Sequence, residues 1–221
     1  MSAAFSSYDA AMSNSVQSSY DAIAEEYAKH YADELGRKPF DRKMLDWLIE
    51  KIGTLGSICD LGCGPGQVAA YLASRGAAAC GIDLSEEMVR TAHRLNPGLS
   101  FEQGDMRALH KVADAAFGGI AAFYSIIHVD RASVADALRE LHRILRPGGV
   151  LLVTFHIGTD VIHRDEMWEK PVSLDFNFYE RNEMKEFLSA AGFTLEEAIE
   201  RDPYPGAEYE SRRAYIFARK P

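Results

Sequence analysis

The stretch ICDLGCGPGQ, residues 58–67, constrains the possible fold more than any other part of the sequence. A short apolar run leads into three glycines at alternate positions, and the helix-forming segment QVAAYLASRGA follows. Glycines in the loop that leaves a parallel strand let a ligand lie against bare backbone N–H groups. The sequence therefore predicts a ligand cradle where the first strand of an α/β sheet ends.

The same alternation of apolar runs and helical segments continues along the chain and predicts the rest of the sheet. Strands are expected at residues 57–61, 78–83, 99–103, 117–124 and 150–157, and helices at 20–35, 39–53, 67–77, from Ser85 onward, at 133–145 and at 181–193. The last two runs, 194–202 and 212–220, are close enough to pair as an antiparallel hairpin. These elements indicate a parallel sheet with helices on both faces.

Length and composition favour one domain that stays in the cytoplasm. The chain has 221 residues, 47% of them hydrophobic, and the net charge of -9 argues against a protein that grips a nucleic-acid backbone. Cys59, Cys63 and Cys80 contain no CxxC pair, so we expect reduced thiols and neither disulfide nor zinc site. The N-terminus has no signal-peptide pattern, and no apolar run reaches membrane-spanning length. We expect a soluble protein without a membrane partner.

The glycine spacing separates two kinds of nucleotide site. A nicotinamide dinucleotide site would have G-x-G-x-x-G, whereas this loop has G-x-G-x-G with Pro65 inside the turn. Asp60 adds a carboxylate that a pyrophosphate would repel. A cofactor with a cationic end fits this loop better.

Five segments, in order, resemble motifs of the class I S-adenosylmethionine-dependent methyltransferases of the small-molecule type. They are DLGCGPGQ, GIDLSEEMV, GDM at 104–106, AAFYSIIHV and LRPGGVLLV. The resemblance runs from about Tyr20 to the end of the chain and implies a Rossmann-like seven-stranded sheet of order 3-2-1-4-5-7-6 with the seventh strand antiparallel. It implies S-adenosyl-L-methionine as cofactor and S-adenosyl-L-homocysteine as product.

The resemblance also implies a set of cofactor contacts. Asp83 would accept hydrogen bonds from the ribose hydroxyls, and Asp105 would accept one from the adenine amino group, with Met106 on the ring. Met88 could equally be helix core, and two tyrosines on one helix face are more often core than cofactor contacts. The full set of expected cofactor residues is Tyr20, Tyr27, Asp60, Gly62, Cys63, Gly64, Gly66, Asp83, Leu84, Met88, Asp105, Met106 and Phe123.

The acceptor side is expected over the fourth and fifth strands. Residues 1–40 are interpreted as a tail and lid helix, and residues 157–179, which lack helical or strand periodicity, as a cap over the acceptor pocket. Tyr124, Trp168 and Phe176 are candidate substrate contacts. His128 and His156 follow central strands and are candidate general bases, although each could instead only bond to backbone.

The reaction expected is in-line methyl transfer to an oxygen or nitrogen atom of a small organic molecule. The tetrapeptide AFYS stands where enzymes acting on DNA bases or glutamine carry an NPPY-type sequence, and no convergent carboxylates suggest a metal. Two alternatives remain open: a nicotinamide-dependent oxidoreductase, and a protein that binds S-adenosylmethionine without catalysis. The chain could be a monomer or a homodimer.

Overall fold

A seven-stranded sheet in the order β3-β2-β1-β4-β5-β9-β8 forms the centre of the computed structural model. The structure describes residues 2–221, and their side chains from Ser15 onward. The strands are β1 (Ile58–Leu61), β2 (Ala79–Asp83), β3 (Ser100–Gln103), β4 (Phe117–Phe123), β5 (Leu145–His156), β8 (Thr194–Arg201) and β9 (Arg213–Arg219). The first five pair in parallel, and β9 runs antiparallel between β5 and β8. Counted along the chain, these seven strands have the order 3-2-1-4-5-7-6, which confirms the predicted sheet.

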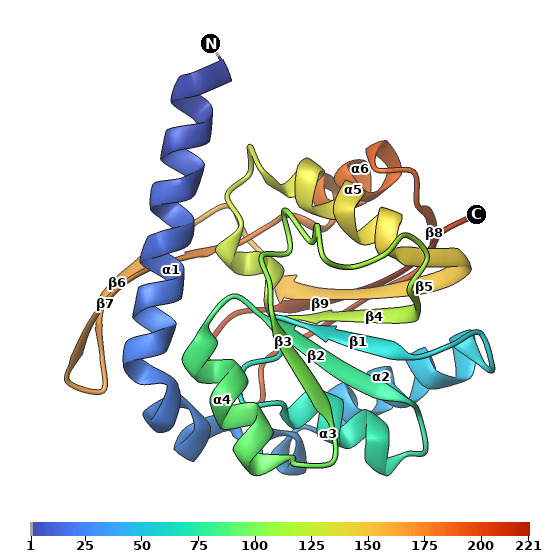
Figure 1. Cartoon of the computed structure of the whole chain (residues 1–221), viewed down its shortest axis with the longest axis horizontal. Coiled ribbons are helices and arrows are strands. Elements are labelled where there is room, and N and C mark those ends of the chain that lie inside the picture. Colours follow the sequence, from blue (N-terminus) through green and yellow to red (C-terminus); the bar gives the residue numbers. More distant parts are fainter. Residues whose placement is uncertain (1) are drawn as a thin grey trace.

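Helices cover both faces of this sheet, as predicted (Figure 1). One face carries α2 (Pro39–Ile52), α3 (Gln67–Ser74) and α4 (Glu86–Leu95), and the other carries α5 (Val134–Ile144) and α6 (Arg181–Ala190). Each helix turns an apolar stripe to the sheet; in α5 this stripe includes Val134, Leu138 and Leu141, all fully buried. Ser85 caps α4, since its hydroxyl accepts a hydrogen bond from the Met88 N–H at 3.1 Å.

The segment at 157–179, in which the sequence shows neither helical nor strand periodicity, has regular structure. It contains β6 (Val161–Met167) and β7 (Lys170–Asn177), which pair antiparallel in a sheet of their own. The strand pattern was hidden because β6 is half-buried or exposed along its whole length, so its apolar and polar residues do not alternate. The hairpin lies alongside the N-terminal helix (Figure 1).

The N-terminal helix, α1 (Ser2–Tyr31), is longer than predicted and includes most of the expected tail, whose first residue lies outside the described residues. It crosses the edge where the carboxyl ends of the central strands meet (Figure 1). Asp21 fixes it to the start of α4 by accepting bonds from the Ser85 hydroxyl at 2.6 Å and the Glu87 N–H at 3.1 Å. On the other side, the Ser19 hydroxyl accepts a bond from the Ser173 N–H in β7 at 2.8 Å.

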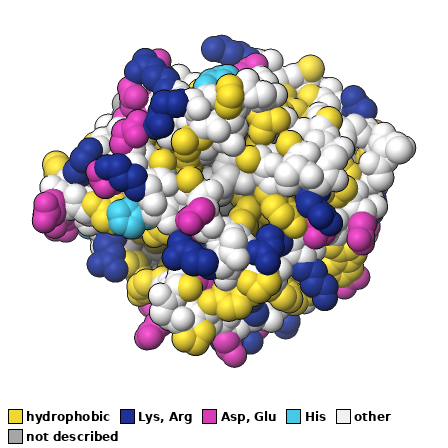
Figure 2. Space-filling model, turned by 90° about the horizontal axis from the view of Figure 1, so that it is seen from below, with side chains coloured by type: hydrophobic (Ala, Val, Ile, Leu, Met, Phe, Trp, Pro, Cys, Tyr) yellow, Lys and Arg dark blue, Asp and Glu magenta, His cyan; other side chains and the backbone are white. Residues whose placement is uncertain are grey.

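Three observations bear on possible partners and on the cysteines. Basic and acidic side chains are interspersed on the face seen in Figure 2, so that face offers no continuous basic surface for a phosphate backbone. Within residues 2–221, no helix combines the length and the hydrophobicity that crossing a membrane requires. Cys59, Cys63 and Cys80 are free thiols, the first two buried.

Candidate functional site

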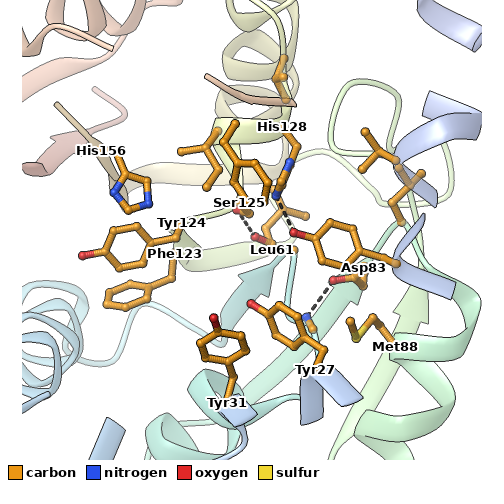
Figure 3. A pocket seen from close by; sticks show the side chains of 18 of the residues that line it. Tyr27, Tyr31, Leu61, Asp83, Met88, Phe123, Tyr124, Ser125, His128 and His156 are labelled. Carbon is orange, nitrogen blue, oxygen red and sulfur yellow. Dashed lines mark hydrogen bonds between the residues drawn. The ribbon is translucent and has the colours of Figure 1, made fainter. Parts of the chain in front are cut away.

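A cavity of about 590 Å³ opens at the carboxyl ends of β1, β2 and β4, beneath α1 and the β6–β7 hairpin. Its size is within the range typical of small-molecule sites, roughly 300 to 1,000 Å³. Most of the predicted site residues line it: Tyr20, Tyr27, Gly62, Gly64, Asp83, Leu84, Met88, Asp105, Met106, Phe123, Tyr124, His128, His156 and Phe176. Figure 3 shows Asp83 and Met88 at one end and Tyr124 and His156 at the other.

The glycine loop forms the floor of the cavity, and its three glycines, Gly62, Gly64 and Gly66, are not all required for the same structural reason. All three adopt left-handed backbone conformations, which favour glycine. A Cβ atom on Gly62 would lie 2.3 Å from that of Ser125, so close packing excludes a side chain. A Cβ on Gly64 would meet only the Tyr27 ring, at 3.7 Å. Gly64 is therefore the glycine whose missing side chain leaves room for a ligand.

Asp83 ends β2 with both carboxylate oxygens held by backbone N–H groups. One accepts a bond from Gly64 at 2.8 Å, the dashed line in Figure 3, and the other accepts one from Ser85 at 2.9 Å. Burial nevertheless raises the pKa of Asp83 to about 6, with a smaller contribution from the Asp21 carboxylate. The carboxylate is thus fixed in place at the cavity wall, and its charge is sensitive to pH near neutrality.

Asp105 and Met106 lie beyond β3 at the same end of the cavity. Arg107 holds the Asp105 carboxylate through its backbone N–H at 2.9 Å and its guanidinium at 2.9 and 3.1 Å. Met88 is almost fully buried and touches the cavity from α4. A carboxylate between two apolar methionine side chains suits a flat heterocycle with an exocyclic amino group.

Tyr20 and His128 connect α1 to the short 3-10 helix Ile126–His128, which follows β4. The Tyr20 hydroxyl lies 2.7 Å from His128 Nε2, and Nδ1 of the same ring lies 3.0 Å from the Asp175 carbonyl oxygen. Since a carbonyl only accepts, Nδ1 carries the proton and Nε2 accepts from Tyr20. Burial lowers the His128 pKa to about 4, so the ring is neutral at physiological pH. Both ring nitrogens of His128 are therefore engaged.

Four predicted residues are not part of the cavity lining. Asp60 is buried behind the loop, where Oδ2 accepts the Ala69 N–H at 3.1 Å and supports the start of α3. Cys63 and Gly66 pack below the loop, where Phe101 crowds Gly66. Trp168 lies on the outer side of α1, stacked on His30 with ring centroids 4.7 Å apart.

Sequence reasoning missed a polar group at the Gly64 end of the cavity. Glu34 accepts a bond from the Gln67 amide nitrogen at 3.0 Å and pairs with Lys38 at 2.5 Å. The Gln67 Oε1 atom is buried and has no hydrogen-bond partner among the described residues. A buried acceptor without a donor, next to a carboxylate, suits the ammonium group of a ligand. The charged run DELGRK between two helices was the only sequence signal for it.

The opposite end, which we call the far chamber, is formed by Tyr124, His156, Phe178, Glu208, Tyr209 and Arg213. Tyr124 has a positive φ of 55°, a strained conformation of the kind that often occurs at functional sites. Nδ1 of His156 lies 2.7 Å from the Ser211 hydroxyl. Burial, with help from nearby Arg213, lowers the His156 pKa to about 3, so this ring is also neutral.

A buried charge network supports the far chamber from behind. Arg201 pairs with Asp41 at 2.8 Å and with Glu208 at 2.7 Å. The Tyr215 hydroxyl donates to Asp41 and lies 2.7 Å from the Tyr124 hydroxyl. Because these groups are buried, their pairing fixes Tyr124 and Glu208 in the chamber wall.

The side chains of the described residues contain no cluster of three or more His, Cys, Asp or Glu suited to a metal ion.

Comparisons with known proteins find similarity to methyltransferases. Residues 58–149 match a family model described as a methyltransferase domain. The malonyl-[acyl-carrier protein] O-methyltransferase of Enterobacter lignolyticus is 30% identical over 160 residues, covering 71% of this chain and 61% of that protein. The trans-aconitate 2-methyltransferase of an Azoarcus species is 34% identical over 156 residues, covering 69% and 54%. This chain thus spans less than two thirds of either relative.

A solved structure shares the fold over nearly the whole chain. It is the Burkholderia thailandensis 1,6-didemethyltoxoflavin-N1-methyltransferase with bound 1,6-didemethyltoxoflavin and S-adenosylhomocysteine. The TM-score is 0.70 at 21% sequence identity, covering 97% of this chain and 89% of that one. At this identity the comparison concerns the fold alone.

Proposed function

We propose that this chain is a class I S-adenosylmethionine-dependent methyltransferase and that it transfers a methyl group to an oxygen or nitrogen atom of a small organic acceptor. The observation that carries the proposal is the single cavity that joins the Asp83 and Gly64 end to the far chamber. A donor and an acceptor could lie end to end in it, as in-line displacement requires.

The residues present fit S-adenosylmethionine. The open space over Gly64 leaves the backbone accessible, Asp83 offers carboxylate lone pairs for ribose hydroxyls, and Asp105 can accept from the adenine amino group. Glu34 and the unpartnered Gln67 Oε1 would receive the ammonium group. The cofactor supplies a methyl group on a positively charged sulfur, which is already a good leaving group.

The protein therefore has to position the acceptor, exclude water and receive a proton. Residues of α1 and of the β6–β7 hairpin line the cavity, and in the proposed reaction these two segments would keep water from the transferred methyl group. His156 is better placed than His128 to receive the proton, since both nitrogens of His128 are bonded. A neutral imidazole of low pKa is a weak base, but it suffices once methylation makes the bound acceptor strongly acidic.

Thermal unfolding with added ligands tests the cofactor assignment. Saturating S-adenosylhomocysteine should raise the melting temperature, because a ligand at 100 times its Kd adds about 2.7 kcal/mol to the free energy of unfolding. NAD should leave it unchanged, and stabilisation by NAD alone would favour the oxidoreductase. Gly64→Val is expected to fold without binding, and it serves as the control variant once it shows a cooperative thermal transition.

Turnover separates an enzyme from a protein that only binds the cofactor. A library of small hydroxyl and amine compounds, including those carrying carboxylates, should be screened for production of S-adenosylhomocysteine from S-adenosylmethionine. Product formation above the acceptor-free rate supports catalysis. Tight cofactor binding without turnover on any acceptor would favour the non-catalytic alternative.

A further inference from the structure

The walls of the far chamber are largely aromatic. The rings of His156 and Phe178 stack with centroids 5.0 Å apart and planes 21° from parallel. Tyr209 meets both rings edge-on, with centroids 6.2 Å from each, and Tyr124 lies 5.5 Å from His156. Such walls favour a flat ring, which can use both stacking and edge contacts.

Lys38 and Arg213, the cations beside these rings, already have carboxylate partners. Arg164 also lines the cavity, but it lies on the largely exposed strand β6, and it has no ion pair among the described residues. Lys38 pairs with Glu34 at 2.5 Å and lies 3.6 Å from Glu208. Arg213 lies 3.4 Å from Glu208 and also donates to two backbone carbonyl groups. The Glu208 side chain is only 1% exposed, and burial alone would raise its pKa, but the bonds from Arg201 and the Tyr204 N–H lower this pKa to about 2, so Glu208 carries a negative charge in the chamber wall. A carboxylate or phosphate ligand would bring a second negative charge into a buried, already neutralised site.

His156 supplies the polar atom that remains available. Its Nδ1 is bonded to the Ser211 hydroxyl, while Nε2 has no hydrogen-bond partner among the described residues. The ring lines the cavity, so a ligand can reach it (Figure 3). With the proton on Nδ1, Nε2 accepts a hydrogen bond from an O–H or N–H group.

We propose that the acceptor is a flat, uncharged aromatic or heteroaromatic molecule whose O–H or N–H group donates to Nε2 of His156. This inference rests on the proposed methyl transfer and specifies its substrate class. Methylation forms a bond between the acceptor atom and the methyl carbon, breaks the carbon–sulfur bond and leaves the electron pair on sulfur. The acceptor proton passes to Nε2 of His156 and then to solvent.

A matched pair of probes tests the substrate class: 2-naphthol, neutral at pH 7, and 2-naphthoate, the same ring system with a carboxylate. Binding of each to the protein saturated with S-adenosylhomocysteine is measured by titration calorimetry. We expect 2-naphthol to bind at least about tenfold more tightly, since the carboxylate has to lose its hydration without gaining an unpaired cation beside the aromatic rings of the far chamber. In His156→Phe, which keeps the stacked ring but lacks Nε2, this advantage should disappear.

A second variant tests the charge argument by gain of binding. Glu208→Gln removes the negative charge that neutralises Lys38 and Arg213, so 2-naphthoate should bind at least about tenfold more tightly than to the natural protein. Glu196→Gln is the matched control, because Glu196 pairs with Lys51 and Arg219 outside the cavity lining. It should leave both affinities unchanged.

Two results with the natural protein would overturn the inference, whatever the stability of the variants. One is 2-naphthoate binding as tightly as 2-naphthol, or more tightly. The other is no binding of either probe at millimolar concentration. Saturation with S-adenosylhomocysteine is established first, so a failure of that step refutes the proposed function itself, whereas a failed probe comparison refutes only the substrate class.

Discussion

Cofactor affinity should fall as the pH drops through about 6, because Asp83 then loses its charge. Burial raises the pKa of this carboxyl to about 6, although Gly64 and Ser85 both donate to it. The ionised form can accept hydrogen bonds from ribose hydroxyls on its remaining lone pairs. The protonated carboxyl has one acceptor site fewer and no longer carries the negative charge that strengthens such bonds.

The size of the effect follows from the titration. With a pKa of about 6, roughly 97% of the Asp83 carboxyls are ionised at pH 7.5 and roughly 9% at pH 5. If only the ionised form binds, the Kd for S-adenosylhomocysteine rises about tenfold between these values, or about 1.4 kcal/mol. Asp83→Ala should weaken binding by about 30-fold to 1,000-fold at pH 7.5, the range expected for two charge-assisted hydrogen bonds with partial replacement by water.

Asp83 affects the stability of the ligand-free protein in the direction opposite to its effect on cofactor affinity as the pH changes. A carboxyl whose pKa is raised on folding favours the folded state at low pH, and this contribution is lost as the pH rises through about 6. Protonation of Asp83 at pH 5 therefore does not destabilise the fold, so unfolding caused by this residue does not explain the expected loss of cofactor binding. The two effects can be measured separately by unfolding without ligand and by titration with it.

The assay is titration calorimetry with S-adenosylhomocysteine from pH 5 to 8 at constant ionic strength. Asp83→Asn is the matched variant, since it keeps the shape of the side chain but cannot ionise. Its affinity should be weaker at pH 7.5 and nearly constant with pH. A constant Kd in the natural protein, or the same pH dependence in Asp83→Asn, would refute the argument.

Predictions for four further variants concern other parts of the site. Gly64→Val should abolish S-adenosylhomocysteine binding but leave a cooperative thermal transition; an unfolded variant would show that this glycine serves the turn instead. Asp41→Ala should lower the free energy of unfolding in urea by about 3 kcal/mol, because Arg201 loses a buried partner; an unchanged midpoint would contradict that. Once an acceptor is known, His156→Ala should lower turnover at least about 100-fold at nearly unchanged cofactor affinity. His128→Ala should chiefly weaken cofactor binding, since Tyr20 loses its partner; near-normal behaviour of both variants from pH 6 to 9 would indicate catalysis by positioning alone.

The main sheet was predictable because local patterns determine it. The central strands β1, β4, β5 and β9 contain apolar runs, and Ser85 and the glycine loop mark where helices begin. The β6–β7 hairpin was missed because β6 is exposed on both sides and carries no alternating pattern. The early start of α1 was missed because its serine-rich first half has little apolar periodicity.

The site was predictable where it lies next to strand ends. Asp83 and Gly64 line the cavity as expected, whereas Asp60, only a few residues away, is buried behind the loop. Sequence distance does not reveal this difference, because the direction of a side chain depends on the local turn. Glu34 and Glu208 were missed because they lie 174 positions apart in sequence, and only the folded chain brings both to Lys38.

The division of the cavity between its two ends has a consequence for how such a chain diversifies. The floor under the cofactor end lies in residues 58–149, the part that matches the methyltransferase family model. Most of the far chamber, including His156, Phe178, Glu208 and Arg213, lies after this region, and Lys38 lies before it. Substitutions in these flanking segments can therefore change the acceptor without disturbing the cofactor floor. Transplanting residues 150–213 together with 31–41 between relatives should transfer acceptor choice as a unit.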